Sequence, residues 1–597
     1  MPLRRMMAQT FLPVALSRRE NPLAPEVIST DPCRVLATAV VLFRLNYFEA
    51  AARILIESGL PLKSKAAALV GANCHFELGE FRSALETLSQ IGSLESWTDG
   101  QFQQLLGHLR LIAGEEAAAV PSLEIAAAAM THLRRPHQNL SARDNQDYRP
   151  TEIDFEAGRL GLLYDGYNYL GQRVTHVGAG QLGAGLYGRA LACQKELRQA
   201  FPLLSEKLAI FLASHNIDPL ELRLLPAEWF TQIGHLGMLD ILFRMRQLGW
   251  WRGRAVLLVP SDRIANEPLL SLFNEEGLAL IAGWNIDADI FAELVSLQRY
   301  AGMTFNAFEM PDGEILPWQD AGARLMRIWD EEARLPPLRQ ALDARSGATV
   351  KAMIAGTIKK WGMGENDWHV CLHMRDAAHY SETNGIGQSH RNAAVENYMD
   401  AIRHITRRGG WVIRLGGGSV DPLPKMERVV DYALSPDKSP VLDLHLIRQA
   451  RFFIGTTSGL TNIAVSFGVP CALVNCITTD AQLWSDRVRF ILKQVEENGR
   501  PITQREFTST PWRWRMFSAQ VLRHHAALAW DNTPDEILEI VKEVGEEAQM
   551  IHDGGAPQPD ELLAEWRKSL LDEAFYGNAR PSRYWLAKHR TALLGTI

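Results

Sequence analysis

The chain has few cysteines and none of the cysteine spacings that bind zinc. Six cysteines are spread over 597 residues without a C-x-x-C pair, and three of them lie in or beside apolar runs. Isolated cysteines of this kind are typical of reduced core residues in a cytoplasmic protein, and they argue against a disulfide framework. We therefore expect a cytoplasmic location and no metal site.

Long apolar runs and an excess of positive charge are also missing. The apolar piece Phe11–Leu16 is followed at once by Ser17-Arg18-Arg19-Glu20, and no stretch approaches the length that spans a membrane. We expect at most a peripheral membrane contact through the basic start of the chain. The net charge of −7 and the isoelectric point near 6.2 argue against general nucleic-acid binding, so we expect no nucleic-acid partner.

Several well-known catalytic motifs do not occur. The sequence has no Walker loop, no H-E-x-x-H pair and no G-x-S-x-G elbow. The triple glycine Gly416–Gly418 lacks the G-x-G-x-x-G spacing, and Pro422 and Pro424 follow where a phosphate-binding helix would start. A nicotinamide or flavin enzyme is therefore not expected.

An internal helical repeat is present near the start. The segment Phe43–Ala51 matches Phe76–Ala84 about 33 residues later, and a degenerate third copy containing Gly114 follows about 35 residues further on. These spacings bracket the 34-residue period of tetratricopeptide repeats, with a plain helical bundle as the alternative. Such arrays usually present a concave face to a peptide, so a protein partner or acceptor is implied.

The rest of the chain alternates between strand and helix patterns. Such alternation predicts doubly wound, Rossmann-like α/β layers, and a chain of this length needs more than one core. The predicted division is a lead-in over 1–35, tetratricopeptide-like repeats over 36–135, a linker at 134–151, a Rossmann-like domain over 151–350, a second over 351–550, and a tail helix within 551–597.

The first of these domains has three predicted strands and one long helix. Ala255–Val259 and Leu278–Ala282 are clean apolar runs, and Glu228–Gly237 is interpreted as strand, glycine-flanked turn and helix start. A continuous helix is predicted from Leu191 to about His215. In the second domain we expect strands at Trp368–Met374 and Trp411–Leu415.

The stretch Arg451–Asn475 is the most informative part of the second domain. It is interpreted as a strand at Phe452–Ile454, a tight turn at Gly455–Gly459, a helix at Leu460–Phe467 and a strand at Cys471–Val474. Free amides and the positive dipole end at such a helix start favour phosphate. The small residues there would let a phosphate approach, although many α/β units share this pattern.

Three strand ends of the second domain carry polar residues. These are His373, Arg375 and Asp376 after one strand, Arg414 with its glycines after the next, and Thr456–Gly459 after a third. Ligands of open α/β sheets bind at the carboxyl ends of strands. Two arginines and a helix start at one edge would suit a diphosphate, whose charge they neutralise.

These motifs resemble those of a known enzyme group. The sequence has H-x-R at His373–Arg375, I-R-L-G at Ile413–Gly416, and D-L-x-L-I-x-x-A-R-F-F-I-G-x-x-S-G-L-x-x-x-A-x-x-x-G-x-P from Asp443. The chain resembles GT-B fold glycosyltransferases, more narrowly a bacterial group with tetratricopeptide-like amino-terminal regions, and its donor motifs are similar to those of the O-fucosyltransferase type. The resemblance is good over residues 368–475 and weak over 151–350.

The resemblance implies a function. Two Rossmann-like domains would bind a UDP- or GDP-sugar in the cleft between them, without an obligatory metal or other cofactor. The sugar would pass by an inverting displacement to a hydroxyl of a protein or glycan. The alternatives are a scaffold protein with an inactive GT-B half, and another nucleotide-sugar enzyme such as an epimerase or a phosphorylase.

The resemblance also implies roles for individual residues. Arg375 and Arg414 would stabilise the leaving diphosphate, with an ion pair between Arg414 and Asp376 or Asp443 as the alternative. The remaining donor-binding candidates are His373, Asp443, Thr456, Thr457, Ser458, Gly459 and Leu460. Asp443 is equally explained as the first residue of a helix, and His373 as a structural residue within its strand.

The general base is expected from the first α/β domain. His235 lies between Gly234 and Gly237 at a predicted turn, and its ordinary pKa near 6.5 suits proton transfer. A packing or capping role is the alternative for this histidine. Further candidates for the base are Asp240, Asp262 and Glu382, the last of which lies in a polar loop that could close over the donor.

Overall fold

A computed structural model describes most of the chain. It covers residues 31–594 apart from 45–46, 63, 91–98, 131–157, 178, 227, 252–254, 259–263, 275–278, 282–286, 305–306, 376–388, 418–421, 477–483, 510–511, 516–518, 556–559 and 573–574. The predicted linker at 134–151 lies outside these residues, as do Asp262, Asp376 and Glu382. No helix in the described ranges is long and apolar enough to cross a membrane.

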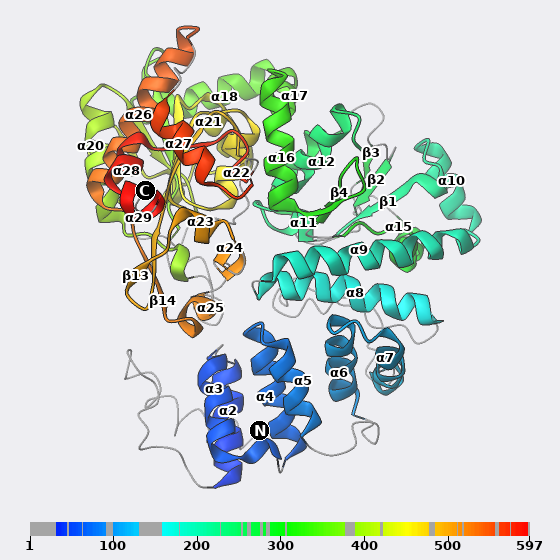
Figure 1. Cartoon of the computed structure of the whole chain (residues 1–597). Helices are drawn as coiled ribbons and strands as arrows, with labels where there is room; N and C mark the ends of the chain where they lie inside the picture. Colours follow the sequence, from blue (N-terminus) through cyan, green and yellow to red (C-terminus); the bar gives the residue numbers. More distant parts are fainter. Residues whose placement is uncertain are drawn as a thin grey trace.

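The chain begins with pairs of helices that form a separate region (Figure 1). The pairs are α2 (Pro32–Arg44) with α3 (Phe48–Ser58), α4 (Lys65–Glu77) with α5 (Phe81–Ser89), and α6 (Gly100–Ile112) with α7 (Glu116–Met130). Their first helices begin 33 and then 35 residues apart, which is the spacing of the sequence repeat. Gly79 and Gly114 turn the second and third pairs with φ of 78° and 81°, a conformation that favours glycine.

A fourth helix pair extends this region beyond residue 135. Helices α8 (Gly158–His176) and α9 (Gly180–Leu197) share one hydrophobic core with α4 to α7, including Leu123, Tyr167 and Leu186. The predicted helix from Leu191 to His215 is wrong. It ends at Leu197, and α10 (Glu206–Ser214) starts afresh, because Pro202 interrupts the pattern and Ser205 caps the next helix by accepting a hydrogen bond from the Leu208 amide.

The first α/β region is built on a small parallel sheet. Its strands β1 (Leu222–Leu225), β2 (Ala255–Leu258) and β3 (Ala279–Ile281) lie in the order β1-β2-β3, and Gly302 forms a parallel bridge to Leu224 on the open side of β1. The helices around it are α11 (Glu228–Thr231), α12 (Leu236–Gln247), α13 (Glu267–Ser271), α14 (Ala288–Ser296), α15 (Gln298–Ala301), α16 (Trp318–Glu331) and α17 (Pro337–Arg345). The next helix, α18 (Ala348–Lys360), lies beside α21 (Pro440–Gln449) of the second α/β region (Figure 1).

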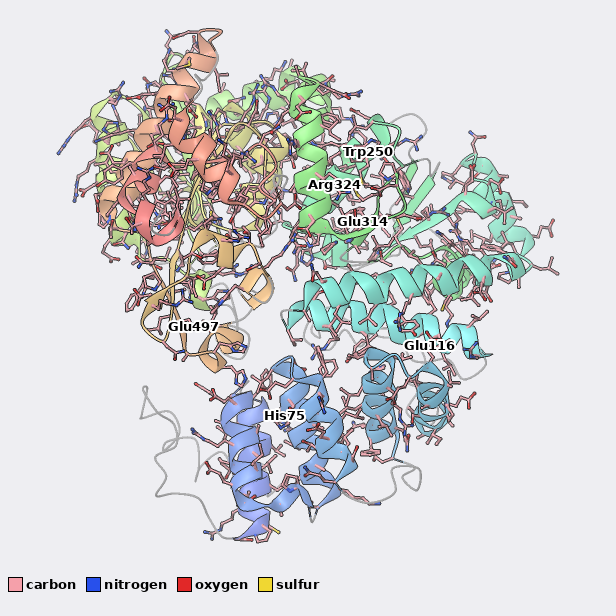
Figure 2. All side chains as sticks on the ribbon, viewed as in Figure 1. His75, Glu116, Trp250, Glu314, Arg324 and Glu497 are labelled. Atoms are coloured by element: carbon pink, nitrogen blue, oxygen red, sulfur yellow. The ribbon has the colours of Figure 1, made fainter. Side chains whose placement is uncertain are left out.

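The strand predicted at the start of Glu228–Gly237 is wrong. Glu228–Thr231 is a helical turn, and the strand precedes it at Leu222–Leu225. Neighbouring side chains of a strand point to opposite faces of the sheet. Trp229 and Phe230 are neighbours, yet both are buried. An antiparallel pair, β4 (Ala307–Glu309) and β5 (Ile315–Pro317), lies beside α16, where Arg324 donates from Nη1 to Glu314 Oε2 over 2.9 Å (Figure 2).

The second α/β region has a seven-stranded parallel sheet in the order β15-β11-β10-β9-β6-β7-β8. Its strands are β6 (His369–Leu372), β7 (Trp411–Arg414), β8 (Val429–Val430), β9 (Phe452–Gly455), β10 (Cys471–Cys476), β11 (Val488–Leu492) and β15 (Arg580–Pro581). From β6 the chain builds outward through β7 and β8, then returns to add β9 on the other side of β6. The α/β class is therefore confirmed, with a topological switch point between β6 and β9.

Helices cover both faces of this sheet. On one face α21 (Pro440–Gln449) packs beside α22 (Gly459–Ser466), and His369 and Cys371 both bond to the Leu446 carbonyl of α21. On the other face α20 (Met399–Arg407) and α26 (Pro534–His552) pack together. A 3-10 turn at Val395–Tyr398 leads directly into α20.

Two further parts complete the second region. A small antiparallel sheet contains β12 (Gln494–Glu497), β13 (Arg500–Pro501) and β14 (Ala527–Trp530), with α23 (Gln504–Phe507), α24 (Trp512–Arg515) and α25 (Ala519–His524) beside it. The end of the chain forms α27 (Glu561–Ser569), β15, α28 (Arg583–Lys588) and α29 (Arg590–Leu594). The expected tail helix is therefore α27, and the residues after it add a strand to the main sheet.

The helical region contacts the second α/β region through a charged cluster. Glu80, at the start of α5, pairs with His75 Nδ1 at 2.6 Å and with His524 Nε2 of α25 at 2.9 Å (Figure 2). The hydrogen bonds from His524 and His75 lower the pKa of Glu80 to about 2. Two segments far apart in sequence, α4–α5 and α25, thus meet at one carboxylate.

Candidate functional site

The switch point brings the ends of β6 and β9 together. The two strands pair in parallel, Leu372 opposite Ile454, so the residues that follow them leave the sheet side by side. Arg375 follows β6 and is buried, with 7% of its surface exposed. Its Nη1 donates to the carbonyl oxygen of Thr457, beyond β9, over 3.5 Å. The guanidinium is thereby fixed beside the turn Thr456–Gly459.

The turn after β9 ends in an open helix start. Ser458 caps α22 by accepting from the Thr461 amide over 3.4 Å, and Thr461 Oγ1 donates to the Thr456 carbonyl over 2.6 Å. The amides of Gly459 and Leu460 donate no hydrogen bond to any described residue. Two free N–H groups at the positive end of a helix favour an anion.

The hydroxyl of Thr456 adds a second donor at this turn. Its Oγ1 is buried and has no hydrogen-bond partner in the described part of the chain. A buried hydroxyl without a partner costs free energy, so it is expected where a ligand supplies the missing bond. Thr457 is buried as well, and its carbonyl holds Arg375.

Gly459 is required for a reason that the sequence did not reveal. A Cβ atom at this position would lie 2.5 Å from the Gly234 amide nitrogen, and one at Gly234 would lie 3.1 Å from Gly459 Cα. The two glycines allow the backbones of the two α/β regions to meet. This backbone contact explains why Gly459 has no side chain, and the binding of a phosphate at its amide stays a prediction.

His235 lies at this contact between the two regions. It is the half-buried residue just before α12, and Asn462 of α22 donates from Nδ2 to the neighbouring Gly234 carbonyl over 3.2 Å. His235 makes no side-chain cap on α12, so the capping alternative is not found. The structure thus places the sequence-predicted histidine and the start of α22 on two segments in direct contact.

Arg414 is engaged by a carboxylate that the sequence analysis missed. At the end of β7 its Nε and Nη2 donate to Asp431 Oδ1 and Oδ2 over 2.7 and 2.8 Å, and the Leu423 amide donates to the same carboxylate over 2.9 Å. The predicted partners were Asp376 and Asp443. Because Asp431 already balances its charge, Arg414 is better suited to shaping the loops after β7 and β8 than to neutralising a ligand.

Asp443 and His373 flank the same edge. Asp443 does not begin its helix: α21 starts at Pro440 with Ser439 as the cap, because the Ser439 side chain accepts from the Leu442 amide. Burial raises the pKa of Asp443 above its ordinary value. His373 Nδ1 lies 3.2 Å from the Leu415 carbonyl and so links the ends of β6 and β7.

Asp240 is excluded as the general base by its surroundings. It is fully buried on α12, where Arg244 Nε donates to its Oδ2 over 2.8 Å. Arg244 also donates from Nη2 to the Ser466 carbonyl of α22 over 3.3 Å and stacks on Trp329. The pair therefore fastens α12 to α22, and of the two predicted bases among the described residues, only His235 is outside this buried ion pair.

Two further residues lie at this edge that the sequence patterns did not predict, Asn462 and Lys438. Asn462 joins α22 to the Gly234 turn, and Lys438 donates from Nζ to the Gly416 carbonyl. Both occupy the first turn of a helix or the residues just before it, which is the only sequence signal that could have identified them. Comparison with protein-family models and with curated proteins finds no match for this chain.

Proposed function

We propose that the chain is a glycosyltransferase of GT-B type, with a tetratricopeptide-like helical region ahead of two Rossmann-like domains. The observation that carries this proposal is the switch point, where three kinds of donor lie together: buried Arg375, and the Gly459 and Leu460 amides and Thr456 hydroxyl, which have no hydrogen-bond partner among the described residues. These groups are all donors, and they suit a diphosphate that gains charge as it leaves a sugar.

The proposed reaction transfers a glycosyl group in one inverting step. An acceptor hydroxyl gives its proton to the imidazole of His235 while its oxygen bonds to the anomeric carbon. The bond from that carbon to the diphosphate oxygen breaks on the opposite side, and the electron pair leaves with the nucleoside diphosphate. Arg375 and the amides of Gly459 and Leu460 stabilise this charge, and no cofactor is required.

The proposed acceptor is a protein or a glycan. It would enter from the α12 side, because the Gly234–His235 turn packs over the start of α22. The helical pairs continue through α8 and α9 and contact both α/β regions. A helical region in that position could present a protein segment to the junction, which favours a protein acceptor.

The test is product analysis with a panel of UDP- and GDP-sugars. We expect Arg375→Gln to lower kcat by roughly 10²–10³, the usual effect of losing one donor to a developing anion. Thr456→Val serves as a second variant, since it removes a hydroxyl without a partner in the described chain and leaves the fold intact. It should weaken donor binding by about tenfold, a loss of about 1.4 kcal/mol.

Three outcomes would separate the proposal from its alternatives. Wild-type protein that binds no nucleotide sugar in calorimetry would favour a scaffold function. Formation of an altered nucleotide sugar, or of a sugar phosphate, would favour an epimerase or a phosphorylase. Undiminished turnover by both Arg375→Gln and Thr456→Val would show that the donor binds elsewhere.

A further inference from the structure

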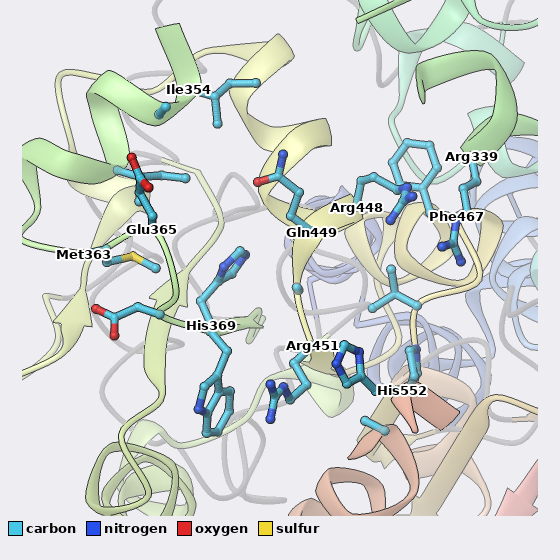
Figure 3. Close-up of a pocket in the computed structure, with 18 of the residues that line it drawn as sticks. Arg339, Ile354, Met363, Glu365, His369, Arg448, Gln449, Arg451, Phe467 and His552 are labelled. Carbon is cyan, nitrogen blue, oxygen red and sulfur yellow. The ribbon is translucent and has the colours of Figure 1, made fainter. Parts of the chain in front are cut away.

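A cavity of about 1100 Å³ lies at the amino-terminal edge of the seven-stranded sheet, opposite the switch point (Figure 3). His369 begins β6 there, and Arg451 and Pro470 precede β9 and β10. The other walls come from α18, the end of α21 and the end of α26. The volume is large enough for a small-molecule ligand.

The cavity has a strong excess of positive side chains. It is lined by six cations, Arg339, Lys351, Lys359, Arg448, Arg451 and Arg487, against two carboxylates, Glu365 and Asp367. The Asp367 carboxylate is already hydrogen-bonded within the protein. Its Oδ2 accepts from the Gly364 amide over 2.9 Å and from Trp411 Nε1 over 3.0 Å. Positive charge therefore dominates the space.

Three of the arginines come from different segments and crowd together. Burial and then the neighbouring charges of Arg448 and Arg487 hold the pKa of Arg339 below its usual range. The Arg339 guanidinium donates no hydrogen bond to any described residue, and the Nε of Arg448 is buried without an acceptor in the described chain. Like charges held this close are unfavourable unless an anion offsets them.

The negative ends of nearby helices offset only part of the positive charge of these side chains. The carboxyl ends of α21, α22 and α26 face the cavity, and each carries roughly half a negative charge, about one and a half in total. Arg487 Nη1 caps one of them by donating to the Gly468 carbonyl over 3.0 Å, and Asp343 pairs with Arg448 at 2.7 Å. A positive surplus remains after these partners are counted.

We propose that this cavity binds an anion bearing two or more phosphate groups. Arg339, Arg448 and Arg487 form one binding wall, and the planar donors of arginine suit phosphate oxygens. Lys351 and Lys359 project from α18 and supply positive charge for a further phosphate group. The site is separate from the switch point and does not depend on the proposed function.

The test is calorimetric titration of the full chain with inorganic pyrophosphate. We expect Arg339→Gln/Arg487→Gln to weaken binding at least tenfold, and Arg339→Gln alone, which removes no hydrogen bond to a described residue, to weaken it about threefold. The matched control Arg403→Gln/Arg407→Gln removes two exposed arginines of α20 and should change binding less than twofold. Thr456→Val, which weakens diphosphate binding at the switch point, should leave the binding that depends on Arg339 and Arg487 unchanged.

The same double variant distinguishes a lipid headgroup from a soluble ligand as the source of the phosphate groups. Cosedimentation with vesicles of cardiolipin, which carries two phosphate groups, but not with vesicles of phosphatidylcholine, that is lost in Arg339→Gln/Arg487→Gln would assign a lipid headgroup. Pyrophosphate binding without vesicle binding would assign a soluble ligand. Absence of both, or equal weakening in the Arg403→Gln/Arg407→Gln control, would overturn the proposal.

Discussion

The two edges of the seven-stranded sheet present hydrogen-bond donors and positive charge by different means. At the carboxyl edge the donors are few, and one of the two arginines is already paired, Arg414 with Asp431. There the donors are buried Arg375 and the first amides of α22, which donate no hydrogen bond to any residue that the structure describes. At the amino edge the helices present their negative ends, and Arg339, Arg448 and Arg487 exceed what those ends require.

This difference shows how the doubly wound arrangement places charge. Parallel strands with intervening helices gather helix starts at one edge and helix ends at the other. A helix start needs little help from side chains to hold a phosphate, because its amides point outward. A site at the opposite edge must overcome the helix ends with cations, so an arginine cluster there is informative.

The largest stability effect is expected at Arg414. Arg414→Gln removes a buried bidentate partner from Asp431 and should lower the free energy of unfolding by about 3 kcal/mol, measured by urea denaturation. Arg403→Gln, which breaks an exposed pair with Asp400, should cost less than about 1 kcal/mol. A cost below 1 kcal/mol together with lost sugar transfer would instead make Arg414 part of the active site.

A pH-dependent effect is expected at the amino edge. Burial and then the charge of Asp486 raise the pKa of Asp330 from 3.8 to about 7, while its Oδ2 accepts from the Asp486 amide. The folded state therefore keeps a proton that the unfolded state loses near pH 3.8, so this group lowers stability as the pH rises towards and through 7.

Asp330→Asn should remove the loss of stability that the Asp330 carboxyl causes as the pH rises. The variant should gain roughly 2 kcal/mol over wild type in urea denaturation at pH 8, and little at pH 4, after allowance for the partial exposure of Asp330. An equal gain at both pH values would show that Asp330 is ionised in the folded protein throughout this range.

A steric effect is expected at the carboxyl edge. Gly459→Ala places a Cβ against the Gly234 backbone and should cost about 1–3 kcal/mol through displacement of the two segments. Gly356→Ala is the matched control, because its Cβ meets nothing within 4 Å on α18 and should stabilise by about 0.5–1 kcal/mol. If both substitutions stabilised the protein, the two α/β regions would not meet at these glycines.

The smallest effect is expected at Arg339. Arg339→Gln relieves repulsion from Arg448 and Arg487, and it should raise the free energy of unfolding by a few tenths of a kcal/mol at low salt. The gain should disappear at about 1 M salt, where charges are screened within about 3 Å. A loss of stability at low salt would show that Arg339 has a favourable partner.

The strands of the large sheet were predictable because they are buried on both faces. Phe452–Ile454 and Cys471–Val474 are uninterrupted apolar runs, and both lie within strands. Helices near the first sheet were harder to predict, because Trp229 and Phe230 form an apolar pair that suits a strand as well as a helix. The local sequence pattern did not distinguish a helix from a strand at these residues.

Part of the candidate site followed from strand ends. Arg375 and the turn Thr456–Gly459 could be placed together because each directly follows a strand of one parallel layer. The partner of Arg414 could not be found in this way. Asp431 lies 17 residues further along the chain, beyond β8. A contact between two loops produces no periodic pattern in the sequence from which it could be predicted.

The sequence by itself determined the alternation of strands and helices, the repeat of the helical region and the residues at the strand ends, since each depends on neighbours within a few turns of chain. Only the tertiary structure decided the strand order, the pairing of Arg414 with Asp431, and the meeting of Gly234 with Gly459. It also decided the crowding of Arg339, Arg448 and Arg487, because packing brings Arg339 to two arginines that lie more than a hundred positions further along the sequence.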